Sequence, residues 1–217
     1  MMLERSEQAK NSLVARLAAR ARKEAGQSKT RDPGLFVERF YARVPADAVI
    51  AIDEGALFAA ALSAWRLLQV RKPDTPTIRI FNPTSDADGW TCAHTVIEIV
   101  NDDMPFLVDS VTAELNRNEL TVHLLIHPVV RVKRDKTGKL TQLCDDDAGG
   151  AGESVMHIQV TEQNVPEALK RIQQGLESVL GDVRAAVDDW RAMRVKLADA
   201  IAELDATHPP LPAGEIE

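Results

Sequence analysis

Residues 98–132 read EIVNDDMPFLVDSVTAELNRNELTVHLLIHPVVRV, and this stretch decides the fold class. It opens inside a run rich in β-branched residues, CAHTVIEIV at 92–100, which predicts a strand. Ile97 and Ile99 point to one face of that strand and only Glu98 is polar on the other, so both faces are expected to be largely covered. The strand ends at Asn101-Asp102-Asp103, and a helix is predicted from about Met104 to Asn118.

The second half of the stretch predicts another strand, over Leu120–Val132. Its residues alternate between apolar and polar, which is the pattern of a strand with one buried face. The apolar face carries Val122, Leu124, Ile126, Val130 and Val132. Pro128 lies inside this strand, and because proline has no backbone N–H to donate, we expect an edge position or a bulge there.

The residues before this stretch predict a helical region and one short strand. Apolar side chains recur at helical spacing over residues 3–25, from Pro33 to Val44 and after the N-cap Asp53. Pro73 and Pro76 end the helical pattern, and Thr77–Phe81 follows as a strand.

The residues after it predict a loop, a strand and a long helical end. Arg134–Gly152 is polar, acidic and glycine-containing, and is expected to be an exposed loop or the end of a hairpin. Ser154–Val160 alternates as a strand does. The remainder is helical, with Gly181 expected to divide it in two before a Pro-rich terminus. Its apolar residues are spaced mostly by threes and fours: Leu169, Ile172, Leu176, Val179, Val183, Val187, Trp190, Leu197, Ile201 and Leu204.

This order predicts an α+β fold: a ferredoxin-like antiparallel sheet with helices on one face, completed by the strand at Thr77–Phe81. Three parts are expected along the chain. They are an N-terminal helical subdomain (1–75), an α+β domain (76–180) and a C-terminal helix with the Pro-rich end (181–217).

Composition limits the function classes. The formal net charge of −7 argues against nucleic-acid binding, which needs a clustered excess of Lys and Arg. No apolar run approaches the ~20 residues of a membrane span. Cys92 and Cys144 are the only cysteines, and their spacing fits no zinc motif. The sequence therefore predicts a reduced, cytoplasmic protein.

No catalytic, metal or cofactor motif is present. The glycines never form the G-x-G-x-x-G turn of a dinucleotide site, and Gly149-Gly150-Ala151-Gly152 lies in an acidic loop. His123 and His127 share a strand face but would lie about 13 Å apart, too far to bind one metal ion. We therefore expect no catalytic residue and no metal ligand in this chain.

Asp103, Pro105 and Leu107 match the Asp-x-Pro-x-Leu signature of ACT domains, and Phe106 stands where those domains usually carry glycine. More specifically, residues 98–132 and 62–82 (LSAWRLLQVRKPDTPTIRIFN) closely resemble the N-terminal region of the large bacterial NAD-dependent glutamate dehydrogenases. The resemblance spans about residues 35–200. It implies an ACT-like fold in a non-catalytic segment. It also implies that the dehydrogenase domain, with its NAD, lies elsewhere in a longer polypeptide.

The resemblance implies an effector site for an amino acid at Asn101, Asp102, Asp103, Met104, Pro105 and Phe106. Asp102 or Asp103 would bind the ammonium group, and helix N–H groups the carboxylate. As the alternative, Asn101, Asp102 and Asp103 cap the following helix and the Phe106 ring fills the ligand space. The expected function is accordingly a regulatory and assembly module, with self-association or other parts of the enzyme as partners, or a purely structural docking module without a ligand.

Overall fold

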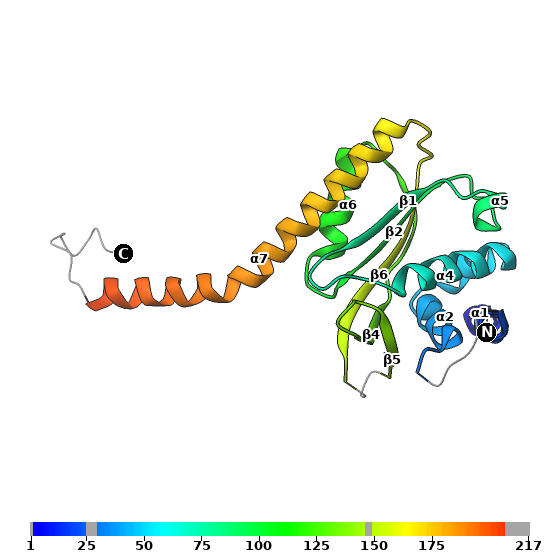
Figure 1. The fold of residues 1–217 in the computed structure, drawn as a ribbon, viewed down its shortest axis with the longest axis horizontal. Helices are drawn as coiled ribbons and strands as arrows, with labels where there is room; N and C mark the ends of the chain where they lie inside the picture. The colour runs from blue at the N-terminus through cyan, green and yellow to red at the C-terminus, as the bar shows by residue number, and fades with distance from the viewer. Residues whose placement is uncertain (1, 25–29, 146–148, 207–217) are drawn as a thin grey trace.

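The computed structural model describes residues 2–24, 30–145 and 149–206, so the Pro-rich terminus lies outside the described residues. Figure 1 shows a twisted sheet between two helical layers, with one long helix leaving the body. The helices are α1 (Met2–Glu24), α2 (Pro33–Ala42), α3 (Ala46–Ile50), α4 (Glu54–Leu68), α5 (Ser85–Asp88), α6 (Leu107–Arg117) and α7 (Pro166–Ala206). The strands are β1 (Thr77–Phe81), β2 (Thr95–Asp102), β3 (Val122–Ile126), β4 (Val129–Arg134), β5 (Leu140–Cys144) and β6 (Ala151–Val160).

The sheet confirms the predicted α+β, ACT-like fold. Its strand order is β1-β2-β6-β4-β5, with β3 also paired to β6, and every pairing is antiparallel. The unit β2-α6-β3-β6-α7 is the predicted strand-helix-strand-strand-helix series. β1 pairs with β2 at the edge and so completes the sheet as expected.

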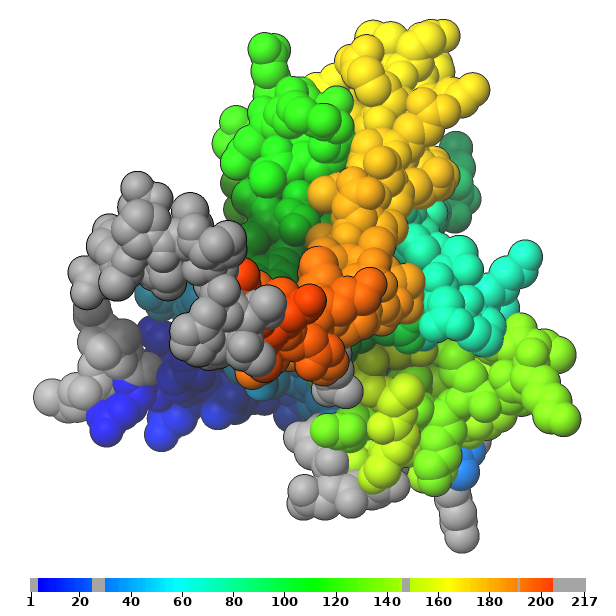
Figure 2. Space-filling view, turned by 90° about the vertical axis from the view of Figure 1, so that its left-hand side faces the viewer, coloured from blue at the N-terminus to red at the C-terminus, as the bar shows by residue number. Residues whose placement is uncertain are grey.

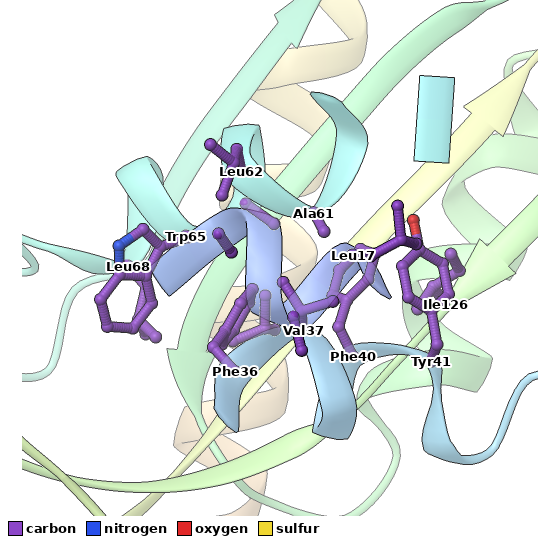
Figure 3. Close-up of a cluster of buried hydrophobic side chains, with 14 of the residues drawn as sticks. Leu17, Phe36, Val37, Phe40, Tyr41, Ala61, Leu62, Trp65, Leu68 and Ile126 are labelled. Carbon is purple, nitrogen blue, oxygen red and sulfur yellow. The ribbon is translucent and has the colours of Figure 1, made fainter. Parts of the chain in front are cut away.

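Both faces of the sheet are covered. Ile97 and Ile99 pack with α6 and α7 in one apolar cluster. Val100 and the other face pack against the N-terminal helices in a second cluster. Figure 3 shows this second cluster, where Phe36 of α2 contacts both Phe40 of the same helix and Trp65 of α4. The helical region and the sheet thus share a core, and the division of the chain at residue 75 stays a prediction.

The expected strand over Leu120–Val132 is split. β3 ends at Ile126 and β4 begins at Val129, with His127 and Pro128 between them. The break is where the missing N–H of proline was expected to disturb the ladder. The prediction of a loop over Arg134–Gly152 is wrong in part, because Leu140–Cys144 forms β5 and pairs with β4. Leu140 and Leu143 are buried under the helical layer, a contact that the local sequence does not reveal.

The expected break at Gly181 is wrong. α7 runs without interruption from Pro166 to Ala206, so the predicted boundary at residue 181 falls inside one helix. A glycine costs only about 1 kcal/mol in a helix interior, which the packing of Leu176, Leu180 and Val183 against α6 and the sheet offsets.

Candidate functional site

The predicted effector segment lies where β2 ends and α6 begins. β2 extends to Asp102, and the Asp103 N–H donates to Gly152 O at 3.0 Å. The helix begins at Leu107, not at Met104 as predicted. Phe106 causes this delay, because its φ of 69° lies in the left-handed region and is incompatible with a helical turn.

Phe106 occupies the N-cap position without capping the helix. Its side chain makes no capping hydrogen bond, and its ring is 66% exposed. Most of Phe106 is thus open to solvent, and the filling of a ligand space by its ring stays a prediction. The interpretation of Asn101 and Asp102 as caps is also wrong, since both side chains bond to arginines from other elements. Asp103 remains exposed to solvent.

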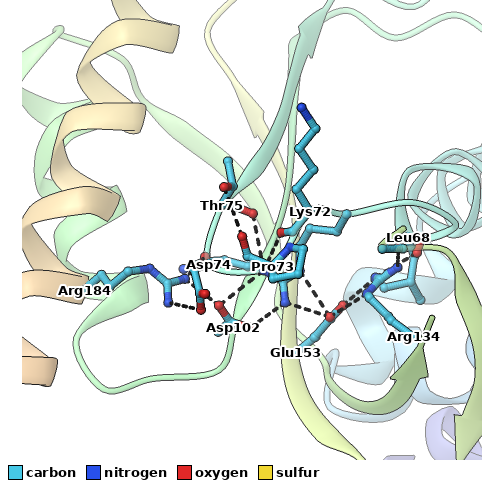
Figure 4. Close-up of polar contacts among 12 residues, drawn as sticks. Leu68, Lys72, Pro73, Asp74, Thr75, Asp102, Arg134, Glu153 and Arg184 are labelled. Carbon is cyan, nitrogen blue, oxygen red and sulfur yellow. Dashed lines mark hydrogen bonds and ion pairs between the residues drawn. The ribbon is translucent and has the colours of Figure 1, made fainter. Parts of the chain in front are cut away.

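Asp102 is held between two arginines. Arg71, in the segment after α4, donates to both carboxylate oxygens, at 3.3 Å through Nη1 and more closely through Nη2. Arg184 of α7 donates from Nη2 to Asp102 Oδ2 at 2.5 Å and to Asn101 Oδ1 at 3.1 Å. Figure 4 shows Arg184 of α7 in contact with Asp102. The last residues of β2 are therefore bonded directly to α7.

A second carboxylate continues the network into the sheet. Glu153 of β6 is 1% exposed and accepts from Arg71 Nη2 at 2.9 Å and from Arg134 Nη2 at 2.6 Å. Arg134 also donates to Leu68 O, the last residue of α4. We call Arg71, Asp102, Arg134, Glu153 and Arg184 the arginine network. A pocket of about 180 Å³ lies beside it.

The charges of the network are mutually stabilised. Burial raises the pKa of Asp102, but hydrogen bonds from Arg71 and Arg184 outweigh it and hold the pKa below its ordinary value of 3.8. Burial lowers the pKa of Arg71. The hydrogen bonds and charges of Asp102 and Glu153 raise it by more, so the pKa of Arg71 lies above its ordinary value. Asp102 and Arg71 are consequently both charged at neutral pH.

Local motifs did not reveal the network. Its hydrogen bonds join residues 19 to 82 positions apart. The one hint is Arg184, which interrupts the apolar stripe of the C-terminal helix between Val183 and Val187.

The histidines of the described residues lie in three separate places. His123 stacks on His94 with ring centroids 4.2 Å apart, and His127 Nε2 lies 2.6 Å from Ser154 Oγ. His157 is fully buried with Glu98, its Nδ1 lying 3.3 Å from Glu98 Oε1. Within the described ranges, no three His, Cys, Asp or Glu side chains form a group that could hold a metal ion.

A family model described as "Glutamate dehydrogenase, ACT1 domain" matches residues 36–176. The chain belongs to this glutamate dehydrogenase ACT1 family. Relatives named NAD-specific glutamate dehydrogenase are 37% identical in Halomonas elongata and 32% identical in Pseudomonas aeruginosa, over 94% and 84% of the chain. The chain spans only 13% and 12% of the length of these two relatives. The resemblance to the N-terminal region of this enzyme family is thereby confirmed.

Most of the arginine network lies inside the ACT1 match. Arg71, Asp102, Arg134 and Glu153 fall within residues 36–176, whereas Arg184 lies beyond it. Arg184 therefore connects the ACT1 region to the part of α7 that follows. Among the residues described by the structure, no helix is both long enough and apolar enough to cross a membrane.

Proposed function

We propose that this ACT1 region is a non-catalytic regulatory and assembly module of a cytoplasmic NAD-dependent glutamate dehydrogenase. In the longer polypeptide, another domain would convert L-glutamate, NAD and water to 2-oxoglutarate, ammonium and NADH. Two findings support the proposal: the relatives carry this enzyme's name over far longer chains, and the sequence here has no dinucleotide-binding glycine turn.

The proposed effector is an amino acid bound at Asn101–Phe106. The exposed Asp103 carboxylate would bind the ammonium group, and the N–H groups of the first turn of α6, which Phe106 leaves without a side-chain cap, would bind the carboxylate. Asn101 Nδ2 is buried and lacks a hydrogen-bond partner among the described residues, so it offers a further donor.

The observation that carries the regulatory part is the bond from Arg184 to Asn101 and Asp102. A ligand that reorients the side chain of Asn101 or Asp102 would change the hydrogen bonds from Arg184 that attach α7 to β2. Differential affinity for the held and released positions of α7 is the thermodynamic requirement for regulation.

A thermal-shift screen tests the proposal. The chain is heated with each common amino acid, with 2-oxoglutarate and with NAD. We expect one amino acid to raise the melting temperature, because a ligand at 100 times its Kd stabilises the folded state by about 2.7 kcal/mol. The shift should vanish in Asp103→Ala and persist in Asp109→Ala, a matched removal of an exposed carboxylate on α6. A shift that survives Asp103→Ala contradicts the site.

The second candidate function is a purely structural docking module without a ligand. It is favoured by the fact that Arg71 and Arg184 already engage both oxygens of Asp102. This candidate predicts that no compound in the screen changes the melting temperature. It also predicts that the full-length enzyme fails to assemble when this region is deleted. Both results together would support it over the first candidate.

A further inference from the structure

A cavity lies between the C-terminal end of α6 and the first part of α7. The two helices lie side by side in Figure 1, and Figure 2 shows them at the top of the molecule, α6 in green and the first part of α7 in yellow. The cavity has a volume of about 640 Å³, within the range of about 300–1,000 Å³ of small-molecule sites. We call it the α6–α7 cavity. Its walls include Glu114, Arg117, Asn118, Glu119, Arg171 and Gly175.

Glu119 stands where the chain turns away from α6, in a backbone conformation that favours glycine. The Leu120 N–H donates to Leu115 O at 3.1 Å, and the Glu119 N–H donates to Asn116 O at 2.9 Å. This is the hydrogen-bond pattern of a Schellman C-cap, whose left-handed residue is usually glycine. Glu119 holds that position with a φ of 58°. The chain therefore carries a carboxylate at the cavity although glycine would fit the backbone better.

Gly175 is the reverse case on the opposite wall. It lies inside α7, although glycine has a lower helix propensity than any residue except proline. A Cβ there would collide with the carboxylate of Glu114, so glycine leaves the room that this side chain needs. Glu114 is 5% exposed, and it accepts from Arg117 Nη2 at 2.7 Å and from Asn118 Nδ2 at 2.9 Å. On both walls the residue opposes the local backbone preference, which is typical of ligand sites.

The charges around the cavity are balanced, and two of them are unpaired. Glu114 and Arg117 form an ion pair with each other. Arg171 and Glu119 also line the cavity, but among the described residues neither side chain makes a hydrogen bond or an ion pair. A guanidinium and a carboxylate that line one cavity without meeting are suited to a ligand that carries both signs of charge. The negative end of the α6 dipole adds to the attraction for a cation beside Glu119.

We propose that the α6–α7 cavity binds a zwitterionic amino acid with a polar side chain. Arg171 pairs with the ligand carboxylate, and Glu119 at the C-terminal end of α6 pairs with the ammonium group. A dicarboxylate would bring a like charge to Glu119, and a diamine would bring one to Arg171. The cavity lies about 16 Å from the effector segment, at the other end of the 11 residues of α6 at about 1.5 Å each, so this site goes beyond the proposed function.

An NMR titration of the isotope-labelled chain with L-glutamine tests the cavity. We expect saturable shifts of the backbone amides of Asn118, Glu119 and Gly175, with a Kd on the order of 1 mM for a ligand of this size. Arg171→Gln should weaken binding at least tenfold, because the ligand carboxylate loses its guanidinium partner. Lys170→Gln is the matched control, since it removes an exposed positive charge of α7 outside the cavity walls. Equal effects of the two variants, or no saturable shift up to about 20 mM, would overturn the proposal.

Glu119→Gly separates loss of binding from loss of folding. It removes the carboxylate and also relieves the left-handed backbone. The variant should therefore melt at the same temperature as the unchanged chain or higher, while its affinity for L-glutamine falls at least tenfold. An unchanged affinity would overturn the role of Glu119.

Two further probes test the class of ligand. 2-Oxoglutarate, which lacks the ammonium group, and putrescine, which lacks a carboxylate, should each bind the cavity at least tenfold more weakly than L-glutamine. An equal affinity of either compound would overturn the zwitterionic assignment.

The effector segment and the α6–α7 cavity can fail separately. Binding of L-glutamine in the cavity should persist in Asp103→Ala and be lost in Arg171→Gln. That result supports the cavity whether or not the effector segment binds a ligand. Shifts confined to the amides of residues 101–106, and abolished by Asp103→Ala, would place the ligand at the effector segment and overturn the cavity site.

Discussion

Phe106 shows how the backbone of one residue sets the start of a helix. Its φ of 69° is a conformation that glycine adopts freely and that costs other residues roughly 1–2 kcal/mol. The ring is mostly exposed and recovers little of this cost by burial. Phe106 thus has a backbone conformation that glycine adopts without strain, at the position where the ACT signature carries glycine.

We predict that Phe106→Gly stabilises the fold by about 0.5–1 kcal/mol, because relief of the left-handed strain exceeds the extra chain entropy of glycine. Urea unfolding measures the change. Phe106→Ala is the control, since alanine keeps a Cβ in the same conformation and should bring no such gain. Equal stabilities of the two variants would contradict the strain at this residue.

At the scale of elements, α7 is a continuous helix in spite of a glycine at its centre. Gly181 is exposed and a Cβ added there would meet no atom within 4 Å. Gly175, six residues earlier, differs because its Cβ would collide with the buried Glu114 carboxylate of α6. Two glycines on one helix therefore have different roles, and only Gly175 is needed for helix packing.

We predict that Gly181→Ala stabilises the protein by about 1 kcal/mol, the helix-propensity difference, and raises Tm by about 2–4 °C. Gly175→Ala has the same propensity gain and should lose it to the displaced Glu114. Calorimetry of the two variants provides the comparison. A destabilising Gly181→Ala would mean that the helix is broken at that residue.

For the whole molecule, the arginine network joins the segment after α4, three strands and α7. Glu153 lies at its centre with Arg71 and Arg134 on either side. A buried ion network is weak support for stability when compared with an apolar core, but removal of one partner leaves an uncompensated buried charge. The network should therefore matter most for the mutual position of the layers.

We predict that Glu153→Ala lowers the free energy of unfolding by about 3 kcal/mol or more, because it removes one of the two carboxylates that Arg71 contacts and the carboxylate that Arg134 contacts. Asp145→Ala, which removes the exposed partner of Arg39, should cost less than about 0.5 kcal/mol. Chemical denaturation at neutral pH measures both. A similar loss of unfolding free energy in the two variants would show that the arginine network behaves like a solvent-exposed ion pair.

The sequence by itself determined the strand-helix-strand-strand-helix series, the apolar faces and the family, but not β5. The β-branched run of β2, the N-cap at Asp53 and the stripe of α7 are local patterns that are readable within one element. The position of the candidate effector segment between β2 and α6 also followed from such patterns, combined with the family resemblance.

Only the tertiary structure decided which of these residues meet. β5 forms because Leu140 and Leu143 find the helical layer, α7 passes through Gly181 because its neighbours pack, and Asp102 binds Arg71 and Arg184 instead of capping α6. Each outcome depends on contacts between distant residues, whose free energy exceeds the local propensity of about 1 kcal/mol or less that the sequence displays.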